Sequence, residues 1–384
     1  MDQKSQKLVE FIKSLYPGAS PVQLHAPVFS GNEKKYLLDC IDSTFVSYVG
    51  PYVTQFEKMT ARFTGARYAI AVVNGTAALQ VALQVAGVKP GDEVITQALT
   101  FAATASAIIH AGAEPVFVDV DQNTMGMSPE RLEDWLVQNT DSAASAEHPI
   151  DEMTGKPVSA VVPMHTFGHP CRIDEIKMIA DKYHIILVED SAESLGSYYK
   201  GKHTGTFGLA GILSYNGNKT ITTGGGGMII TNDEEFARRA RHITTTAKLP
   251  HRWEYAHDEA GYNYRLTNVG AAIGVAQMEK LAEYLKNKRE TAEKYEQFCR
   301  EHGLAFVHEP EGAVSNYWLN AIVMNDRKER DAFLEFSNNN GVATRPIWRL
   351  MNKLDVYRHC QRDDLINSQW REDRIVNIPS GVRI

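Results

Sequence analysis

The sequence predicts an α/β fold in which helices cover both faces of a mostly parallel sheet. Between about residue 54 and residue 232, short apolar segments with the composition of buried strands alternate with segments that have the periodicity of helices. After Asn232 the pattern changes to long helical stretches separated by a few short strands, which predicts a smaller α+β domain. A chain of 384 residues is long enough for one large domain with a small one attached.

Seven short segments have the apolar composition of buried strands. They are YAIAVV (68–73), DEVITQ (92–97), PVFVDVD (115–121), SAVVPM (159–164), IILVED (185–190), AGILSY (210–215) and GMIITN (227–232). The segments with helical spacing before and between them are TQFEKMTARFTGA (54–66), NGTAALQVALQVAGV (74–88), FAATASAIIHAG (101–112) and SPERLEDWLVQN (128–139). The interrupted polar stretch at 141–157 is predicted to be a surface loop.

The chain divides into three predicted parts. Residues 1–22 form an N-terminal segment whose amphipathic helix ends at Pro17 and Gly18. Residues 23–250 form the large domain and residues 251–384 the small one. The helical stretches after Asn232 are 233–246, 268–303 and 327–341, and the strand-like runs are 305–310, 317–324 and 342–348. The long helix in the second of these stretches is expected to join the two domains.

The composition argues against several classes of function. A net charge of −7 implies no basic surface for a polyanion, so nucleic acid is not expected as a partner. The four cysteines lie far apart without a CxxC pair, which is typical of reduced thiols in a cytoplasmic protein. No segment approaches the ~18 apolar residues needed to cross a bilayer, and the N-terminus does not resemble a signal peptide, so no membrane partner is expected.

Chemically useful side chains follow four predicted strands, at the edge of the sheet where α/β proteins bind ligands. Asn74, Gly75 and Thr76 follow the first strand and open a helix, whose free amides can bind an anion. An ordinary helix N-cap explains the same residues. Phe101 follows the second strand, where its ring can stack on a flat cofactor or belong to the core.

Asp190 ends the strand IILVED, and Lys219 follows the strand AGILSY. A carboxylate at the end of a buried strand either caps a turn or needs a cationic partner, such as a protonated pyridine nitrogen. Lys219 precedes four glycines, but Asn218 occupies the position at which a phosphate-binding P-loop requires Gly. A partly desolvated Lys219 can instead act as a nucleophile and then as a base.

These four features together fit one ligand, pyridoxal 5′-phosphate (PLP). The helix start would hold the phosphate, and the ring would lie on Phe101. Asp190 would pair with the ring nitrogen, and Lys219 would bind the aldehyde covalently. Each residue has a separate structural explanation, but their occurrence in this order at four strand ends favours the cofactor.

His165 and His169 in HTFGH have a spacing that metal ligands can have. Gly168 and Pro170 argue against a helix at this point, so the two rings need not share a face, and we expect no metal site. His165 can lie beside the cofactor or have a purely structural role.

Seven longer motifs extend this pattern from about residue 23 to the C-terminus. They are VGPYVTQFE, VNGTAALQVAL, GDEVITQALTFAATA, VPMHTFG, VEDSAESLGS, SYNGNKTITTGGGGM and GYNYRLTNVGAAIG. This ordered set resembles the DegT-type sugar-nucleotide aminotransferases, which have the aspartate-aminotransferase-like PLP fold type I. The resemblance implies a seven-stranded, mostly parallel sheet in the large domain. Within the family, the chain is most similar to the 4-aminotransferases of the legionaminic-acid and bacillosamine routes of amino-sugar biosynthesis.

The resemblance also implies roles for residues that match the family's motifs. Lys219 matches the lysine that binds PLP covalently, Asp190 matches the partner of the ring nitrogen, and Phe101 matches the stacking aromatic residue. The other matched cofactor contacts are Gly75, Thr76, Ser214, Glu193 and Asn263. Because the family donates the last of these from the other subunit, a homodimer with shared active sites is implied.

Two departures from the family pattern concern the substrate more than the chemistry. The family often has Gln where Glu193 stands, and it commonly has SFxPxK where this chain has SYNGNK. Relatives that act as sugar dehydratases have His in place of Lys219, so the lysine favours transamination.

The activity implied by the resemblance is PLP-dependent amination of carbon 4 of a nucleotide-linked 4-keto-6-deoxy sugar. The amino donor would be glutamate, which leaves as 2-oxoglutarate. UDP-linked 4-keto-6-deoxy-N-acetylglucosamine and its GDP-linked equivalent are the expected substrates. A 3-keto sugar and a non-catalytic PLP-binding regulator are alternatives. The expected substrate contacts, each of which has an alternative structural explanation, are His165, Tyr317, Arg345 and Trp348.

Overall fold

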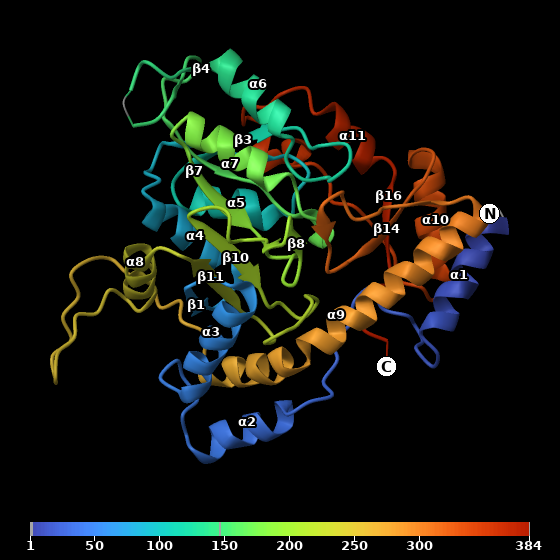
Figure 1. Cartoon of the computed structure of the whole chain (residues 1–384), viewed down its shortest axis with the longest axis horizontal. Helices are drawn as coiled ribbons and strands as arrows, with labels where there is room; N and C mark the ends of the chain where they lie inside the picture. The colour runs from blue at the N-terminus through green and yellow to red at the C-terminus, as the bar shows by residue number, and fades with distance from the viewer. Residues whose placement is uncertain (1–2, 146, 384) are drawn as a thin grey trace.

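The computed structural model describes residues 3–145 and 147–383 (Figure 1). Its centre is a seven-stranded sheet with the order β1-β11-β10-β7-β6-β2-β3. The strands are β1 (Tyr68–Val72), β2 (Glu93–Gln97), β3 (Glu114–Val118), β6 (Val158–Val162), β7 (Ile186–Asp190), β10 (Ala210–Ser214) and β11 (Gly227–Thr231). Neighbouring strands are parallel except where they pair with β11. The predicted mostly parallel sheet of seven strands is therefore confirmed.

Helices cover both faces of this sheet (Figure 1). The helices on one face are α4 (Gly75–Ala86), α5 (Ala102–His110) and α8 (Glu234–Thr244). Those on the other face are α3 (Pro51–Thr64), α6 (Pro129–Asn139), α7 (Ile173–Lys182) and the first turns of α9 (Asn268–His302). Successive strand residues alternate between the two faces, so Ile70 packs into one core and Ala71 into the other. Burial on both faces explains the continuous apolar runs in the sequence.

A second, four-stranded sheet lies near the C-terminal end of α9 (Figure 1). Its strands, in the order β12-β14-β16-β15, are β12 (Ala305–Phe306), β14 (Asn320–Val323), β16 (Ile375–Ile378) and β15 (Arg345–Pro346). The helices α1 (Gln3–Leu15) and α10 (Arg327–Asn339) share a hydrophobic core with it and with the second half of α9. The N-terminal helix thus packs with C-terminal elements, and α9 joins the two cores. The domain boundaries at residues 22 and 250 stay a prediction.

The remaining elements are short. They are α2 (Glu33–Asp42), α11 (Ile366–Glu372), a three-stranded sheet of β8 (Tyr198–Tyr199), β9 (Lys202–His203) and β13 (Ala313–Val314), and 3-10 turns at 166–168, 351–353 and 355–357. The stretch predicted as a loop contains a small hairpin of β4 (Thr140–Asp141) and β5 (Ile150–Asp151). The Asp151 carboxylate stabilises the turn after β5, because it accepts hydrogen bonds from two N–H groups further along the chain. Within the described ranges, no helix combines the length and the apolar character that a bilayer crossing needs.

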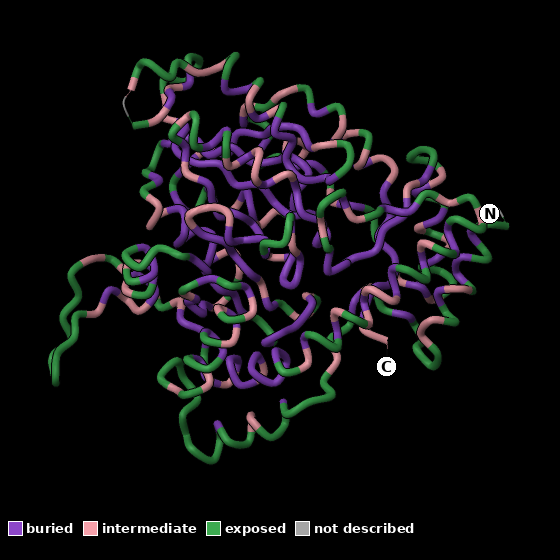
Figure 2. Tube along the Cα trace, viewed as in Figure 1, coloured by how far each residue is buried: buried purple, intermediate pink, exposed green. Residues whose placement is uncertain are grey.

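Burial follows this layered arrangement. Figure 2 shows buried residues along the central sheet and exposed residues along α2 and along the arm that follows α8. This arm, residues 249–258, contains the exposed side chains of Leu249, Trp253 and Tyr255. Large apolar side chains in such positions indicate a surface that another molecule can cover.

A buried ion pair fixes the GYNYR segment against the central sheet. Glu57 on α3 accepts hydrogen bonds from Arg265 Nη2 at 2.6 Å and from the Ala71 backbone N–H at 2.9 Å. Arg241 Nη2 on α8 donates to the second oxygen of the same carboxylate at 2.9 Å. Glu57 and Arg265 are 8% and 6% exposed, so water cannot solvate either charge if its partner is removed.

We expect Glu57→Ala to lower the free energy of unfolding by about 3–5 kcal/mol, because the substitution leaves the buried Arg265 without its partner. Urea unfolding followed by circular dichroism measures this loss. The matched control is Glu235→Ala, which removes an exposed ion pair with Arg238 and should change stability little. Equal losses in the two variants would contradict the assigned role of Glu57.

Candidate active site

A cavity of about 360 Å³ opens at the carboxyl edge of the central sheet. Its walls come from the loops after β1, β2, β7 and β10, from the start of α4, and from two tryptophans of the C-terminal part. It brings together most of the predicted site residues, which are Gly75, Thr76, Phe101, Asp190, Glu193, Ser214, Lys219 and Trp348. The expectation that parallel strand ends converge on one site is therefore met.

The start of α4 forms one end of the cavity. The Asn74 side chain accepts a hydrogen bond from the Ala77 N–H at 2.8 Å, so Asn74 is an ordinary N-cap, which was one of the two interpretations of this motif. Gly75 and Thr76 occupy the first turn, where backbone N–H groups have no acceptor within the helix, and both line the cavity. A Cβ atom at Gly75 would lie 3.2 Å from the Ser214 Cβ, so the glycine lets β10 end close to the helix start. Asn74 can therefore cap the helix while the free N–H groups of the first turn still bind an anion.

Asp190 ends β7 with its carboxylate at the cavity. The side chain is only 5% exposed. One carboxylate oxygen accepts a hydrogen bond from Thr104 Oγ1 at 2.7 Å, and the other accepts one from the Ala192 N–H at 3.1 Å. Asp190 therefore both supports the turn after the strand and presents a buried negative charge to the cavity.

The Lys219 amine lies between a carboxylate and an aromatic ring. Its Nζ is 3.2 Å from Glu193 Oε1 and 4.0 Å from the centroid of the Trp318 ring. The Lys219 side chain is 12% exposed, so the amine faces the cavity with little access to bulk water. An amine held in this way can form a bond to a carbonyl compound and can accept or return a proton.

Glu193 is a fully buried carboxyl group beside this amine. Its second oxygen accepts a hydrogen bond from the Phe167 N–H at 3.0 Å. Burial raises the pKa of Glu193 to about 7, although Lys219 and the Phe167 N–H act in the opposite direction. Asp190 raises it further through like charge. Glu193 can therefore gain or lose a proton near neutral pH.

Aromatic side chains form the mouth of the cavity. The Phe101 side chain is 51% exposed, so it does not belong to the core, which was the alternative interpretation. Its ring centroid lies 6.4 Å from that of Trp348, which in turn lies 5.1 Å from the Phe167 ring. Phe101 and Trp348 line the cavity and offer flat apolar surfaces to a ligand, whereas Phe167 is buried behind Trp348.

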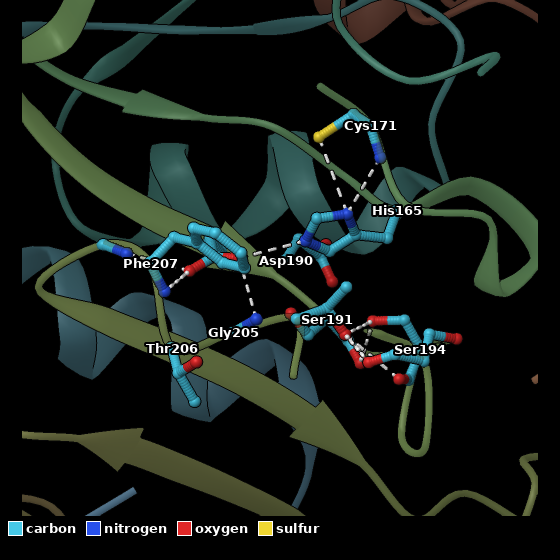
Figure 3. Close-up of polar contacts among 12 residues, drawn as sticks. His165, Cys171, Asp190, Ser191, Ser194, Gly205, Thr206 and Phe207 are labelled. Atoms are coloured by element: carbon cyan, nitrogen blue, oxygen red, sulfur yellow. Dashed lines mark hydrogen bonds and ion pairs between the residues drawn. The ribbon is translucent and has the colours of Figure 1, made fainter. Parts of the chain in front are cut away.

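His165 does not line the cavity, in contrast to the expected substrate contact. Its side chain is fully buried, and Nε2 lies 3.1 Å from Glu189 Oε2. Its Nδ1 accepts a hydrogen bond from the Cys171 N–H at 3.2 Å, and Figure 3 shows the contacts of the ring with Cys171. With partners at both nitrogens and no exposure, His165 has the structural role. Neither His165 nor His169 belongs to a group of three potential metal ligands within the described ranges.

Tyr317, Arg345 and Asn263 also lie outside the cavity lining of this chain. Tyr317 is 4% exposed, and its hydroxyl accepts a hydrogen bond from the Glu309 N–H, so the expected substrate contact is not available to it. Arg345 is exposed and donates from Nη1 to the carbonyl oxygen of Thr344 at 2.8 Å. Asn263 is exposed after the arm 249–258, as a residue donated to another subunit must be.

Comparisons with known proteins agree with this geometry. The model of the DegT/DnrJ/EryC1/StrS aminotransferase family matches residues 28–384. The chain belongs to this family. A GDP-perosamine synthase of Escherichia coli O157:H7 is 36% identical to it over 94% of each chain. The aminotransferase TlmJ of Streptoalloteichus hindustanus has a similar structure, with a TM-score of 0.84, 27% identity and coverage of 94% of this chain and 93% of that one.

A third comparison supports the fold. The Streptococcus pneumoniae protein Spr1654, solved in its PLP form, has the same fold, with a TM-score of 0.82, 22% identity and coverage of 95% and 93% of the two chains. Members of the DegT family depend on PLP, and this chain is a PLP-dependent sugar aminotransferase with the fold type I architecture.

The residues of this aminotransferase fit the cofactor chemically. The start of α4 and the Ser214 hydroxyl supply donors for a phosphate, and the Asp190 carboxylate supplies a partner for a protonated ring nitrogen. The Lys219 amine faces the same cavity. A Cβ atom at Gly227 would lie 2.4 Å from the Asn74 carbonyl, so a larger residue there would displace the start of α4. The glycine run thus lets β11 approach the predicted phosphate site.

Two residues that the sequence patterns did not assign complete the surroundings of the amine. Trp318 contacts Lys219, and the fully buried Asn316 contacts Glu193 through the backbone. They flank Tyr317, an expected substrate contact, but only Trp318 reaches the cavity. A tryptophan at the start of the strand-like run 317–324 was the available signal.

We expect the Glu193→Gln variant of the cofactor-free aminotransferase to become more stable relative to wild type as the pH rises from about 4.5 to about 7. The wild-type pKa of Glu193 is raised to about 7 from 4.5, so ionisation across this range costs the folded protein stability that the amide variant does not lose. Thermal midpoints of both proteins across the range measure the difference. The exposed Glu335→Gln serves as the control, and its difference should stay flat. A difference for Glu193→Gln that does not change with pH would show that the carboxyl ionises as in water.

Proposed function

We propose that this aminotransferase transfers the amino group of glutamate to carbon 4 of a GDP-linked 4-keto-6-deoxy sugar. The main support is its 36% identity, over almost the whole of both chains, to an enzyme named GDP-perosamine synthase. The Lys219 amine in the aromatic-walled cavity agrees with this chemistry. The GDP-linked substrate is preferred over the UDP-linked one because of this relative.

Six residues of the cavity would hold the cofactor in this proposal. Gly75, Thr76 and Ser214 would bind the phosphate, and Phe101 would lie against the ring. Asp190 would pair with the ring nitrogen, and Lys219 would bind the aldehyde carbon covalently before the amino donor arrives. When bound, PLP supplies a ring that accepts negative charge from the substrate carbon.

Lys219 moves the proton in each half-reaction. Once the amino donor has displaced it, the free Nζ would take the proton from the α-carbon of glutamate and deliver it to the carbon that Lys219 had held, so that the amino group stays with the cofactor and water releases 2-oxoglutarate. The same amine acts in the reverse order on carbon 4 of the sugar. The Glu193 carboxyl group, 3.2 Å away, keeps the amine at this position and can exchange a proton with it.

Asp190 supports this chemistry as a fixed negative charge. Its hydrogen bonds from Thr104 and Ala192 orient the carboxylate, so no reorganisation is needed when positive charge lies beside it. An aspartate buried here is stabilised by a cationic partner, which the protonated ring nitrogen would be.

A homodimer is part of the same proposal. The exposed arm 249–258 presents Trp253 at 69% and Tyr255 at 80% exposure, and further exposed apolar side chains lie on α2 and the following loop. A second copy of the chain would cover them. Asn263 follows the arm and would reach the neighbouring cavity as a phosphate ligand.

The proposed substrate is tested with a panel of 4-keto and 3-keto sugars linked to GDP, UDP or dTDP. With PLP and glutamate present, we expect the GDP-linked 4-keto-6-deoxy sugar to give the 4-amino product, identified by NMR, with the highest kcat/KM. Lys219→Arg should give no product, because a guanidinium does not transfer protons at neutral pH. The exposed Lys286→Arg is the matched control and should retain activity. Preference for a 3-keto or UDP-linked sugar would overturn the substrate proposal, and no amino transfer to any sugar would favour a regulator.

We expect Asp190→Asn to lower kcat by about 100-fold or more while KM changes little, because an amide cannot stabilise a protonated ring nitrogen in the transition state. Steady-state kinetics with glutamate measures both parameters. Asp181→Asn, an exposed position on α7 with an ion pair to Lys177, is the control and should behave as wild type. An unchanged kcat in Asp190→Asn would refute the role given to Asp190.

A further inference from the structure

The indole ring of Trp318 lies against the Lys219 amine. The Nζ atom lies 4.0 Å from the ring centroid, which is the distance of a cation–π contact. Trp318 is 4% exposed and lines the cavity, so the contact is shielded from water. Cation–π contacts are strongest to tryptophan and gain strength when they are desolvated.

Three hydrogen bonds fix the Trp318 residue in this place. Its indole Nε1–H donates to the Asn218 carbonyl oxygen at 2.6 Å, and Asn218 is the residue before Lys219. Its backbone N–H donates to Asn316 Oδ1 at 2.8 Å, and its carbonyl oxygen accepts from Lys288 Nζ at 3.2 Å. The backbone is therefore fixed by two of these bonds, and the ring cannot turn away from the amine without breaking the hydrogen bond of its Nε1–H.

Asn316 connects this ring to the second partner of the amine. Its Nδ2 donates to the carbonyl oxygens of Glu193 at 2.8 Å and Leu195 at 2.9 Å. Its backbone N–H donates to Ser197 Oγ at 2.9 Å. One buried asparagine thus holds the backbone of both Glu193 and Trp318, the two residues that contact Lys219, and it ties the C-terminal part to the loop after β7.

Lys288 also helps to fix the backbone of Trp318. Its fully buried Nζ also donates to the Ser380 carbonyl oxygen at 2.6 Å and lies 2.9 Å from His25 Nε2. These partners come from the segment between α1 and α2, the segment before β14 and the C-terminal segment. Three separated parts of the chain therefore meet at the backbone of Trp318.

We propose that Trp318 is a positioning residue that holds the protonated Lys219 amine within the cavity whenever the amine is not bonded to the cofactor. The inference rests on the proposed function, in which the free amine moves a proton twice in each catalytic cycle. A lysine side chain has four rotatable bonds, and the charged amine would otherwise lose its position between taking up the proton and delivering it. The ring contact also persists when Glu193 is uncharged, and the pKa of that carboxyl group, raised to about 7 by burial, makes the uncharged form common near neutral pH.

The proposal is tested first in the cofactor-free protein, by NMR of lysines that carry ¹³C-methyl groups introduced by reductive methylation. Methyl groups above an indole face resonate upfield because of the ring current. We expect the Lys219 signal, assigned by its absence in Lys219→Arg, to lie upfield of the signals of exposed lysines. The shift should be smaller in Trp318→Phe and absent in Trp318→Met. An unshifted Lys219 signal in the wild-type protein would overturn the proposal without any Trp318 variant being needed.

Kinetics of the PLP-loaded enzyme provide the second measurement. We expect Trp318→Met to lower kcat by about 10-fold, with Trp318→Phe in between and with the KM for glutamate nearly unchanged, because the ring acts on the amine and not on the substrate. The matched control is Trp370→Met, an indole that is 43% exposed on α11, which should behave as wild type. Equal losses in the Phe and Met variants, or a loss confined to KM, would also overturn the proposal. The NMR result does not depend on the sugar, so failure of the substrate proposal and failure of this one are distinguishable.

Discussion

The contact between Lys219 and Glu193 is the interaction on which the rest of the site depends. An amine and a carboxyl group lie 3.2 Å apart where water has little access, and a second carboxylate, Asp190, shares the cavity. Buried charges persist only when hydrogen bonds and opposite charges compensate the lost hydration. The surroundings supply that compensation. The Thr104 hydroxyl donates a hydrogen bond to Asp190, the Phe167 N–H donates one to Glu193, and the Trp318 ring contacts the Lys219 amine. Much of the structure around the cavity provides hydrogen bonds or an aromatic contact for these three ionisable groups.

The sheet register explains why these groups meet. β7 and β10 are parallel neighbours, and Ile212 pairs with Asp190. Ser214 therefore lies just beyond the end of β7, and the loop that follows it returns Lys219 to the same edge. Successive residues of a strand point to opposite faces, so Glu189 and Asp190 of β7 face different surroundings. Glu189 pairs with His165 away from the cavity, whereas Asp190 faces it.

The sequence was informative where local patterns determine structure. Continuous apolar runs predicted all seven central strands, and the strand-end rule located Lys219, Asp190 and the start of α4. His165 was expected either beside the cofactor or in a structural role, and its burial and its pairing with Glu189 favour the structural role. This pairing joins residues from two different strand regions, so no local pattern in the sequence reveals it. Trp318 and Asn316 were not assigned for the same reason, since their partners lie about 100 residues away in the chain.

The two parts of the molecule contribute different chemistry to one cavity. The central sheet supplies the charged and polar groups from its strand ends, whereas the C-terminal part supplies the rings of Trp318 and Trp348. Asn316 and Lys288 lock Trp318 to both parts through buried hydrogen bonds. A shift of the C-terminal part would therefore move the ring under Lys219 and the backbone of Glu193 together. The packing of the small sheet, far from any reacting atom, thus controls where the amine lies while it carries a proton.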